Sequence, residues 1–256
     1  MDLELSGRRA LVTGGSKGIG LACAQSLARE GCAIVLAARD PAALDAAAAA
    51  LRAAHGVDVE TIAADLSRGE ERERLLAEAG DIDILINNAG AIPGGSLLDI
   101  DMARWQEAWS LKVMGYIHAT QLALAAMQRR GSGVIVNVIG LAGRQPRWNY
   151  ICGSTGNAAL IAFTEAVGAR SVDFGVRVLG VNPTATRTDR IVSVSRQRAE
   201  AAFGDPERWR ETIGRLPFER LCEPEEVADM VAVLASPRAG YVSGTVVDID
   251  GGASNS

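Results

Sequence analysis

Short apolar runs alternate with longer, helix-like segments along the whole chain. Most of these runs are unbroken by polar side chains, which is typical of strands buried on both faces of a parallel sheet. The runs are Ala10–Thr13, Ala33–Ala37, Val57–Ala63, Ile82–Ile86, Val134–Val138, Val176–Val181 and Thr245–Ile249. The segments between them predict helices over Lys17–Glu30, Asp40 to about Ala54, Met102–Arg130, Tyr150–Phe174 and Glu225–Ala235.

This alternation predicts the fold class. Asp40-Pro41 supplies an N-cap with proline at the first helical position, and Gly31 is a helix stop. Strand–helix–strand units are right-handed and build parallel sheets. We therefore expect an α/β fold with a Rossmann-like, doubly wound parallel sheet, three layers and a single domain over residues 1–256. The polar, Arg- and Glu-rich segment 187–215 interrupts the pattern and is predicted to be a mobile lid.

The composition narrows the function class. Hydrophobic residues make up 48% of the chain and the net charge is −5, so we expect no nucleic-acid partner and no membrane contact. The four cysteines show no C-x-x-C spacing and are accompanied by two histidines, which predicts free thiols and no metal site. The first residues lack a signal-peptide pattern, and no apolar stretch is long enough to span a bilayer. We expect a cytoplasmic location.

A glycine-rich loop follows the first apolar run. Residues Thr13–Gly20 read TGGSKGIG and lead into the first predicted helix. Glycines permit a tight turn, and the N-terminus of the helix offers free N–H groups to a pyrophosphate. This loop predicts a dinucleotide site formed by Gly14, Ser16, Lys17, Gly18, Ile19 and Gly20. The alternative is a turn that serves packing alone.

The loop is also the first of several motifs that together resemble the short-chain dehydrogenase/reductase family over nearly the whole chain. The others are Asp65-Leu66, Asn87–Gly90, Gly133–Gly143, Val181–Pro183 with Thr188, and Asp250–Gly252, although Thr184 stands where the family usually has glycine. The resemblance implies that a nicotinamide cofactor contacts the glycine loop together with Asp65, Leu66, Asn88, Ala89, Gly90, Tyr150, Pro183 and Thr188.

The end of the second predicted strand bears on the choice of cofactor. NAD-preferring relatives carry an acidic residue there, whereas this chain has Ala38 followed by Arg39. Arg39 and Lys17 can pair with a 2′-phosphate, so we predict NADP(H) as the cofactor. The alternative is that both residues are solvated surface charges.

Relatives use Asn, Ser, Tyr and Lys side chains for catalysis, and this chain matches one of them. Tyr150 stands at the position of the tyrosine, which exchanges a proton with the substrate oxygen. Ser154 stands where Lys is expected, Gly140 where Ser is expected, and Lys112 where Asn is expected. An ammonium about 4 Å from a phenol contributes roughly 4 kcal/mol, or about three pKa units. A serine hydroxyl cannot supply this charge.

Lys112 could compensate for the positive charge that is missing at position 154. Our hypothesis is that Lys112 takes over the electrostatic role and that Ser154 contacts the ribose or the space beside it. The alternative is that Lys112 is an exposed helix lysine. Asn157 lies seven residues after Tyr150, on the same predicted helix. It either supports the site by hydrogen bonding or satisfies a helix interface.

Three alternative functions are compatible with these residues. The first, which we favour, is hydride transfer between NADP(H) and a small carbonyl or secondary alcohol, with Tyr150 as the acid–base group. The second is a non-redox isomerase, dehydratase or lyase with Tyr150 and Lys112 as a proton-transfer pair. The third is a cofactor-binding protein without turnover. The resemblance also implies a homodimer or homotetramer.

Four further residues bear on the substrate. Trp148 and Trp209 suggest room for an apolar or aromatic compound. Arg187 and Arg190 either attract an acidic group or are solvated.

Overall fold

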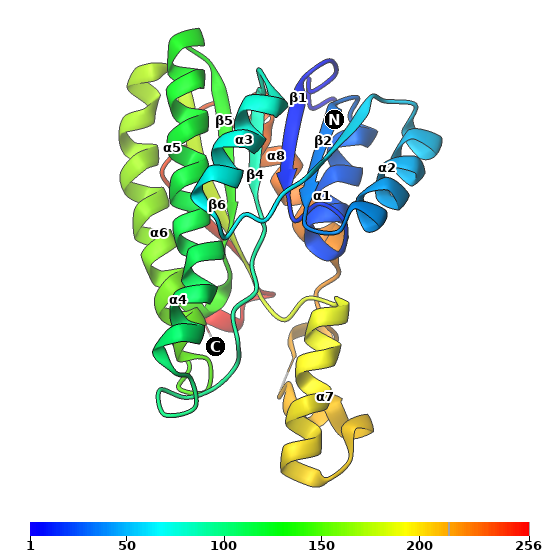
Figure 1. Ribbon diagram of the computed structural model, residues 1–256, viewed down its shortest axis with the longest axis vertical. Helices are drawn as coiled ribbons and strands as arrows, with labels where there is room; N and C mark the ends of the chain where they lie inside the picture. Colours follow the sequence, from blue (N-terminus) through cyan, green and yellow to red (C-terminus); the bar gives the residue numbers. More distant parts are fainter. Residues whose placement is uncertain (215, 256) are drawn as a thin grey trace.

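A parallel seven-stranded sheet forms the centre of the computed structural model, which describes residues 1–214 and 216–255 (Figure 1). The strands are β1 (Arg9–Thr13), β2 (Ala33–Ala38), β3 (Val59–Ala63), β4 (Ile84–Asn87), β5 (Gly133–Val138), β6 (Val176–Pro183) and β7 (Val246–Ile249). Their order is β3-β2-β1-β4-β5-β6-β7, and each neighbouring pair is parallel. The predicted doubly wound sheet is confirmed.

Helices cover both faces of the sheet and produce three layers. The helices are α1 (Gly18–Arg29), α2 (Pro41–His55), α3 (Gly69–Ala79), α4 (Met102–Leu111), α5 (Val113–Arg130), α6 (Ile151–Ser171), α7 (Asp189–Phe203) and α8 (Pro224–Ala235). Helices α1, α2 and α8 lie on one face, and α3, α5 and α6 on the other (Figure 1). Strand β1 shows the division: Ala10 and Val12 join the core under α1 and α8, whereas Leu11 joins the core under α3 and α5.

Some helix boundaries differ from the sequence pattern for local reasons. The predicted helix Met102–Arg130 is interrupted at Lys112, which ends α4 and precedes α5. Tyr150 lies one residue before α6, and residues 172–174 form a short 3-10 helix after it. The pattern misses α3 because its sequence, GEERERLLAEA, buries only Arg72, Leu75 and Ala79 and lacks a full apolar stripe.

The segment predicted as a lid is a helical extension that projects from the body of the molecule (Figure 1). Helix α7 and a 3-10 segment (Pro206–Thr212) pack around Ala199, Trp209 and Leu221. Trp209 is therefore part of the core of the extension, which corrects the expectation that it lines a substrate pocket. Arg215, the last residue of the predicted lid, lies outside the described residues.

The carboxyl ends of the strands meet at one edge of the sheet. The strand order reverses between β1 and β4, and in doubly wound sheets ligands bind outside the carboxyl ends at such a switch point. The glycine loop after β1, the turn after β4 and the segment after β5 all lie at this edge. This arrangement places the candidate site there.

Candidate active site

The glycine loop between β1 and α1 has the geometry of a phosphate cradle. Gly14 and Gly18 have φ angles of 65° and 57°, which favour glycine. A Cβ atom on Gly20 would lie 2.2 Å from the Gly14 oxygen, so glycine is needed for this close approach. Lys17 is the N-cap of α1, and its side chain makes no capping hydrogen bond. The N–H groups of the first turn can therefore bind an anion, and the loop fits a dinucleotide pyrophosphate.

The turn after β4 holds the start of this loop. Thr13 Oγ1 accepts hydrogen bonds from the N–H groups of Asn88 and Ala89, over 2.9 and 3.1 Å. Asn88 Nδ2 donates to the carbonyl oxygens of Thr13 and Gly14, over 3.1 and 3.3 Å. The Asn88 side chain therefore shapes the loop from within the protein.

The two cations expected to recognise a 2′-phosphate are exposed at the carboxyl edge. Within the described part of the chain, neither Lys17 nor Arg39 forms an ion pair. Arg39 lies near Asp65, whose carboxylate accepts hydrogen bonds from Ser67 N (3.2 Å) and Ser67 Oγ (2.9 Å). Burial raises the pKa of Asp65, but these hydrogen bonds and the Arg39 charge outweigh it and lower the pKa overall. Both cations thus remain available to a ligand.

The other predicted cofactor residues come from distant strands. Leu66 is buried after β3, and Pro183 is the last residue of β6. Thr188 is the N-cap of α7, and a Cβ atom on Gly18 would lie 3.3 Å from the Thr188 Cγ2 atom. Ser16 and Ile19 are partly buried in the glycine loop. The fold therefore brings these residues to the same edge.

Lys112 extends from the junction of α4 and α5 towards the segment after β5. Its Nζ donates to the Ile139 oxygen over 2.7 Å and lies 5.8 Å from the centre of the Tyr116 ring. A Cβ atom on Gly90 would lie 3.0 Å from Lys112 Cδ, so the lysine stem packs over the turn after β4. Burial, and secondarily the charge of Arg190, lowers the pKa of Lys112 to about 7. The lysine is partly buried, which rules out the alternative of an exposed helix lysine.

Arg190, in the first turn of α7, reaches across to the turn after β4. Its guanidinium donates to the Gly90 oxygen over 2.8 Å and to the Ile92 oxygen over 2.5 Å. Arg187 pairs with Glu223 over 2.8 Å. Both arginines therefore have protein partners. The contact of Arg190 joins residues 100 positions apart, so no local pattern in the sequence could reveal it.

Tyr150 precedes α6 as its N-cap residue. It packs in an apolar cluster that includes Ile92, Trp105 and Trp109. Tyr150 also lies close enough to Tyr116, the tyrosine beside Lys112, for its ionised form to contribute, after burial and Cys23, to raising the pKa of Tyr116. The structure thus brings Tyr150 and Lys112 into the same region.

Ser154 and Asn157 follow on α6 and face different neighbours. Ser154 is 1% exposed, and its Oγ accepts a hydrogen bond from Arg147 N over 2.9 Å. This contact directs Ser154 into the loop before α6 and does not support our hypothesis of a ribose contact. Asn157 Nδ2 donates to the Gly140 oxygen over 3.2 Å, whereas its buried Oδ1 has no hydrogen-bond partner among the described residues. Asn157 on α6 and Lys112 between α4 and α5 therefore donate hydrogen bonds to two successive carbonyl groups, those of Gly140 and Ile139.

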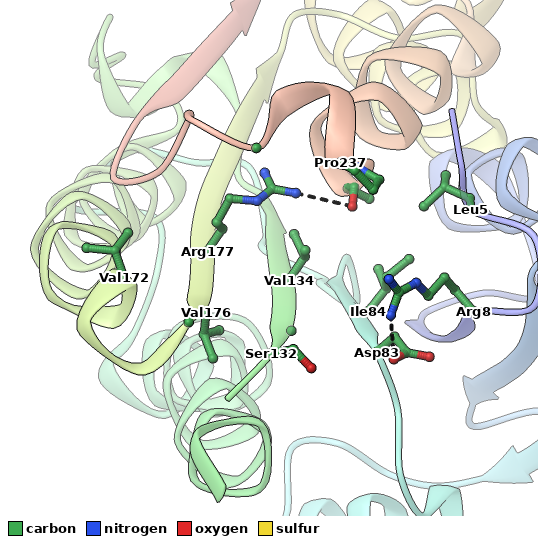
Figure 2. A pocket seen from close by; sticks show the side chains of 14 residues that line it. Leu5, Arg8, Asp83, Ile84, Ser132, Val134, Val172, Val176, Arg177 and Pro237 are labelled. Carbon is green, nitrogen blue, oxygen red and sulfur yellow. Dashed lines mark hydrogen bonds and ion pairs between the residues drawn. The ribbon is translucent and has the colours of Figure 1, made fainter. Parts of the chain in front are cut away.

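A hollow of about 340 Å³ lies at the opposite edge of the sheet, among the amino-terminal ends of the strands (Figure 2). Arg177 donates there to carbonyl oxygens at the end of α8, including those of Leu234 (2.8 Å) and Ser236 (2.9 Å). Arg8 pairs with Asp83 over 3.3 Å. These charged groups are satisfied within the fold, so the candidate chemistry stays at the carboxyl edge.

The described residues, 1–214 and 216–255, give no sign of a metal site or of a membrane span. They contain no group of three or more His, Cys, Asp or Glu side chains that could hold a metal ion. They also contain no helix long and apolar enough to cross a membrane. The cysteines are free thiols, and Cys152 is fully buried, so burial raises its pKa.

Comparison with known proteins identifies the family. The family model described as short chain dehydrogenase matches residues 8–199. The chain is 32% identical to L-xylulose reductase from Bos taurus over 253 residues, which covers 98% of both chains. It resembles the structure of L-sorbose reductase from Gluconobacter frateurii complexed with NADPH and L-sorbose, with a TM-score of 0.91, 31% identity and 100% coverage of both chains. It also resembles a variant of actinorhodin polyketide ketoreductase with NADPH, with a TM-score of 0.92, 31% identity and 98% coverage of both chains. The chain belongs to the short-chain dehydrogenase family and is an oxidoreductase of that family.

Proposed function

We propose that this chain is an NADP(H)-dependent oxidoreductase that transfers hydride between the cofactor and a small carbonyl or secondary-alcohol compound. The observation that carries the proposal is that one edge of the sheet joins the phosphate cradle to Tyr150 and to the partly buried amine of Lys112. Both solved structures compared above contain NADPH. When bound, NADP(H) supplies the hydride.

The chain's own residues supply binding and proton transfer. Lys17 and Arg39 pair with the 2′-phosphate, and the first turn of α1 binds the pyrophosphate. In the direction of reduction, Tyr150 donates a proton to the substrate oxygen. The charged form of Lys112, held by the Ile139 oxygen, stabilises the phenolate that results. Asn157 Oδ1 accepts a hydrogen bond from a water or hydroxyl group beside them.

The direct test measures the rate at which the enzyme consumes NADPH in the presence of keto sugars and apolar ketones. We expect turnover of at least one compound, and Tyr150→Phe should lower kcat by roughly 100-fold or more because it removes the acid–base hydroxyl. Kd for NADPH should change far less than kcat, because the substitution keeps the ring and the phosphate-binding residues. Tyr241→Phe is the matched control, because Tyr241 is fully exposed. Full turnover by the Tyr150→Phe variant would overturn the assignment of Tyr150.

The choice of cofactor has its own test. Arg39→Ala removes one cation that faces the 2′-phosphate, so we expect Kd for NADPH to rise by about tenfold, the value of one charge-assisted contact. Kd for NADH should change little, because NADH lacks this phosphate. Isothermal titration of both cofactors measures the difference. An equal loss of affinity for NADH and NADPH would contradict the assigned role of Arg39.

One observation favours a second candidate, a non-redox proton-transfer enzyme. Lys112 has a pKa of about 7, so its neutral amine can accept a proton near neutral pH. This enzyme would convert its substrate without any change in the absorbance of NADPH. Product analysis run beside the absorbance assay separates the two candidates.

A further inference from the structure

We infer that Gly153 is a positioning residue for Tyr150: the missing side chain at position 153 forms a seat for the phenol ring and so fixes the hydroxyl. A Cβ atom on Gly153 would lie 2.1 Å from Tyr150 Cε1, 2.2 Å from Cζ and 2.7 Å from the hydroxyl oxygen. The ring therefore lies directly on the first turn of α6. The inference deepens the proposed function and rests on it for the role of the hydroxyl.

The backbone of Gly153 does not itself require glycine. Gly153 is helical within α6 and is not one of the glycines with positive φ. Alanine is more favourable than glycine in a helix. The three atoms nearest to an added Cβ all belong to Tyr150. The ring thus accounts for glycine at this position.

Hydrogen bonds fix the backbone from which the tyrosine side chain extends. Ser154 N donates to the Tyr150 oxygen over 2.9 Å, and Tyr150 N donates to the Arg147 oxygen over 3.1 Å. Ser154 Oγ in turn accepts from Arg147 N over 2.9 Å. On the other side, Gly95 N donates to the Asn149 oxygen over 2.9 Å. With the backbone held, only the side-chain torsions of Tyr150 can still vary. The absence of a side chain at Gly153 leaves room for the rotamer that Tyr150 adopts.

The seat also has an electrostatic consequence. It places the hydroxyl over the first turn of α6, a helix of 21 residues. The positive end of a helix dipole lies at its N-terminus and favours negative charge there. The seat thus supports the phenolate form from the helix side, at a position where Ser154 supplies no charge.

The test is a pair of substitutions combined with changes at Tyr150. Gly153→Ala should displace the ring, so we expect kcat to fall at least about tenfold while Kd for NADPH stays unchanged. Gly153→Ala should also lower Tm by about 3 °C or more, because the added methyl group overpacks the site. In the Tyr150→Phe background, where no hydroxyl remains to be placed, Gly153→Ala should not lower kcat further.

Thermal stability gives a readout that does not depend on activity. In the Tyr150→Ala background the ring is absent, so Gly153→Ala should raise Tm through its better helix propensity. Gly156→Ala is the matched control: its Cβ would lie 3.1 Å from Val113 Cγ2 and 3.2 Å from Trp109 Nε1, with no Tyr150 atom among its nearest neighbours. Its effect on Tm should be the same with and without the Tyr150 ring.

The outcomes separate the inference from the proposed function. Gly153→Ala with the kcat and Tm of the original chain would overturn the seat, as would an equal loss of Tm with and without the ring. If Tyr150→Phe keeps full turnover, the catalytic role of Tyr150 fails and the positioning role fails with it. The Tm cycle then still decides whether Gly153 seats the ring.

Discussion

Lys112 differs most from an ordinary surface residue of its type. Its stem packs over Gly90, its amine donates to the Ile139 oxygen, and its pKa is lowered to about 7. Burying a charge costs stability, and strongly shifted pKa values gather at functional sites. The stability cost of burying the Lys112 amine therefore favours a catalytic role for this lysine. Substitution of Lys112 tests this role in two ways.

Replacing Lys112 should change the kinetics of the enzyme. Lys112→Met keeps an unbranched stem over Gly90 and removes the amine. We expect kcat to fall by about 100-fold and the kinetic pKa of the acid–base group to rise, because the charge that favours the phenolate is lost. Steady-state kinetics across a pH series measure both. Lys17→Met serves as the comparison, since it should raise Kd for NADPH more than it lowers kcat. Unchanged kinetics for Lys112→Met would remove the lysine from the mechanism.

Replacing Lys112 should also change how the stability of the chain depends on pH. Burial lowers the pKa of Lys112 from 10.5 to about 7 in the folded chain. Between these two values the unfolded chain binds more protons, so this lysine's contribution to stability becomes more favourable as the pH rises. Its penalty is fully present below about pH 7. Lys112→Met should therefore raise Tm by a few degrees near pH 6, with a gain that shrinks towards pH 10. A gain that is the same at both ends would contradict the lowered pKa.

The positions of site residues were predictable from the sequence where a motif fixes the local geometry. Gly14, Gly18 and Gly20 are needed for the turn itself, and the structure places them as the pattern indicates. The surroundings of Tyr150 were not predictable in this way. The contact of its ring with Gly153 and the hydrogen bond of Ser154 to the loop depend on the path of residues 144–149, which carry no periodic signal.

At the scale of elements, α7 connects the extension to the site. Arg190 binds the Gly90 and Ile92 oxygens, and Gly90 contacts the Lys112 stem. The base of the extension is held by hydrogen bonds between Cys222 and residues 185 and 187. We propose that residues 187–214 act as a lid and that Arg190 holds it against the turn after β4.

Replacing Arg190 tests this lid. Arg190→Met removes both hydrogen bonds, so amide hydrogen exchange in α7 should become faster and Kd for NADPH should rise. The pH dependence attributed to Lys112 should move to higher pH, since the Arg190 charge helps to lower that pKa. Arg196→Met is the control, because Arg196 pairs with Glu207 inside the extension. Equal exchange rates in α7 for the two variants would exclude the proposed role of Arg190 in holding the lid.

The elements that the sequence predicted best were those with a strong pattern of apolar residues. The β strands were predictable because their apolar runs are buried on both faces. Helix α7 was not predictable from the pattern. Few of its residues are apolar and face the core of the extension, and its other side is rich in charged residues. The interruption at Lys112 was also missed, since the apolar pattern continues through it while the lysine turns towards the Ile139 oxygen.

At the scale of the whole molecule, the outer surface of α6 is unusual. Its inner side buries Leu160 and Ile161, and its outer side exposes small apolar residues: Ala158, Ala159, Ala162, Ala166 and Ala169. Neighbouring α5 adds Met114, which is 51% exposed. The exposed alanines form an apolar stripe beside Thr155, Glu165 and Arg170, and an exposed apolar patch rimmed by polar residues is typical of an interaction surface. We propose that this face of α5 and α6 pairs with a second copy of the chain.

Sedimentation of charged variants tests this assembly. A two-fold interface brings the same patch of both copies together, so Ala162→Arg places two like charges near each other at its centre. We expect the original chain to sediment as a dimer or tetramer and the variant to dissociate into smaller species. Ala54→Arg, on the exposed side of α2, is the matched control and should leave the assembly intact. Because Tyr150 directly precedes α6 and Asn157 lies in its second turn, dissociation should loosen the site. A fall in kcat that follows the fraction of monomer would link the interface to the chemistry, and a monomeric original chain would show that the apolar face has another role.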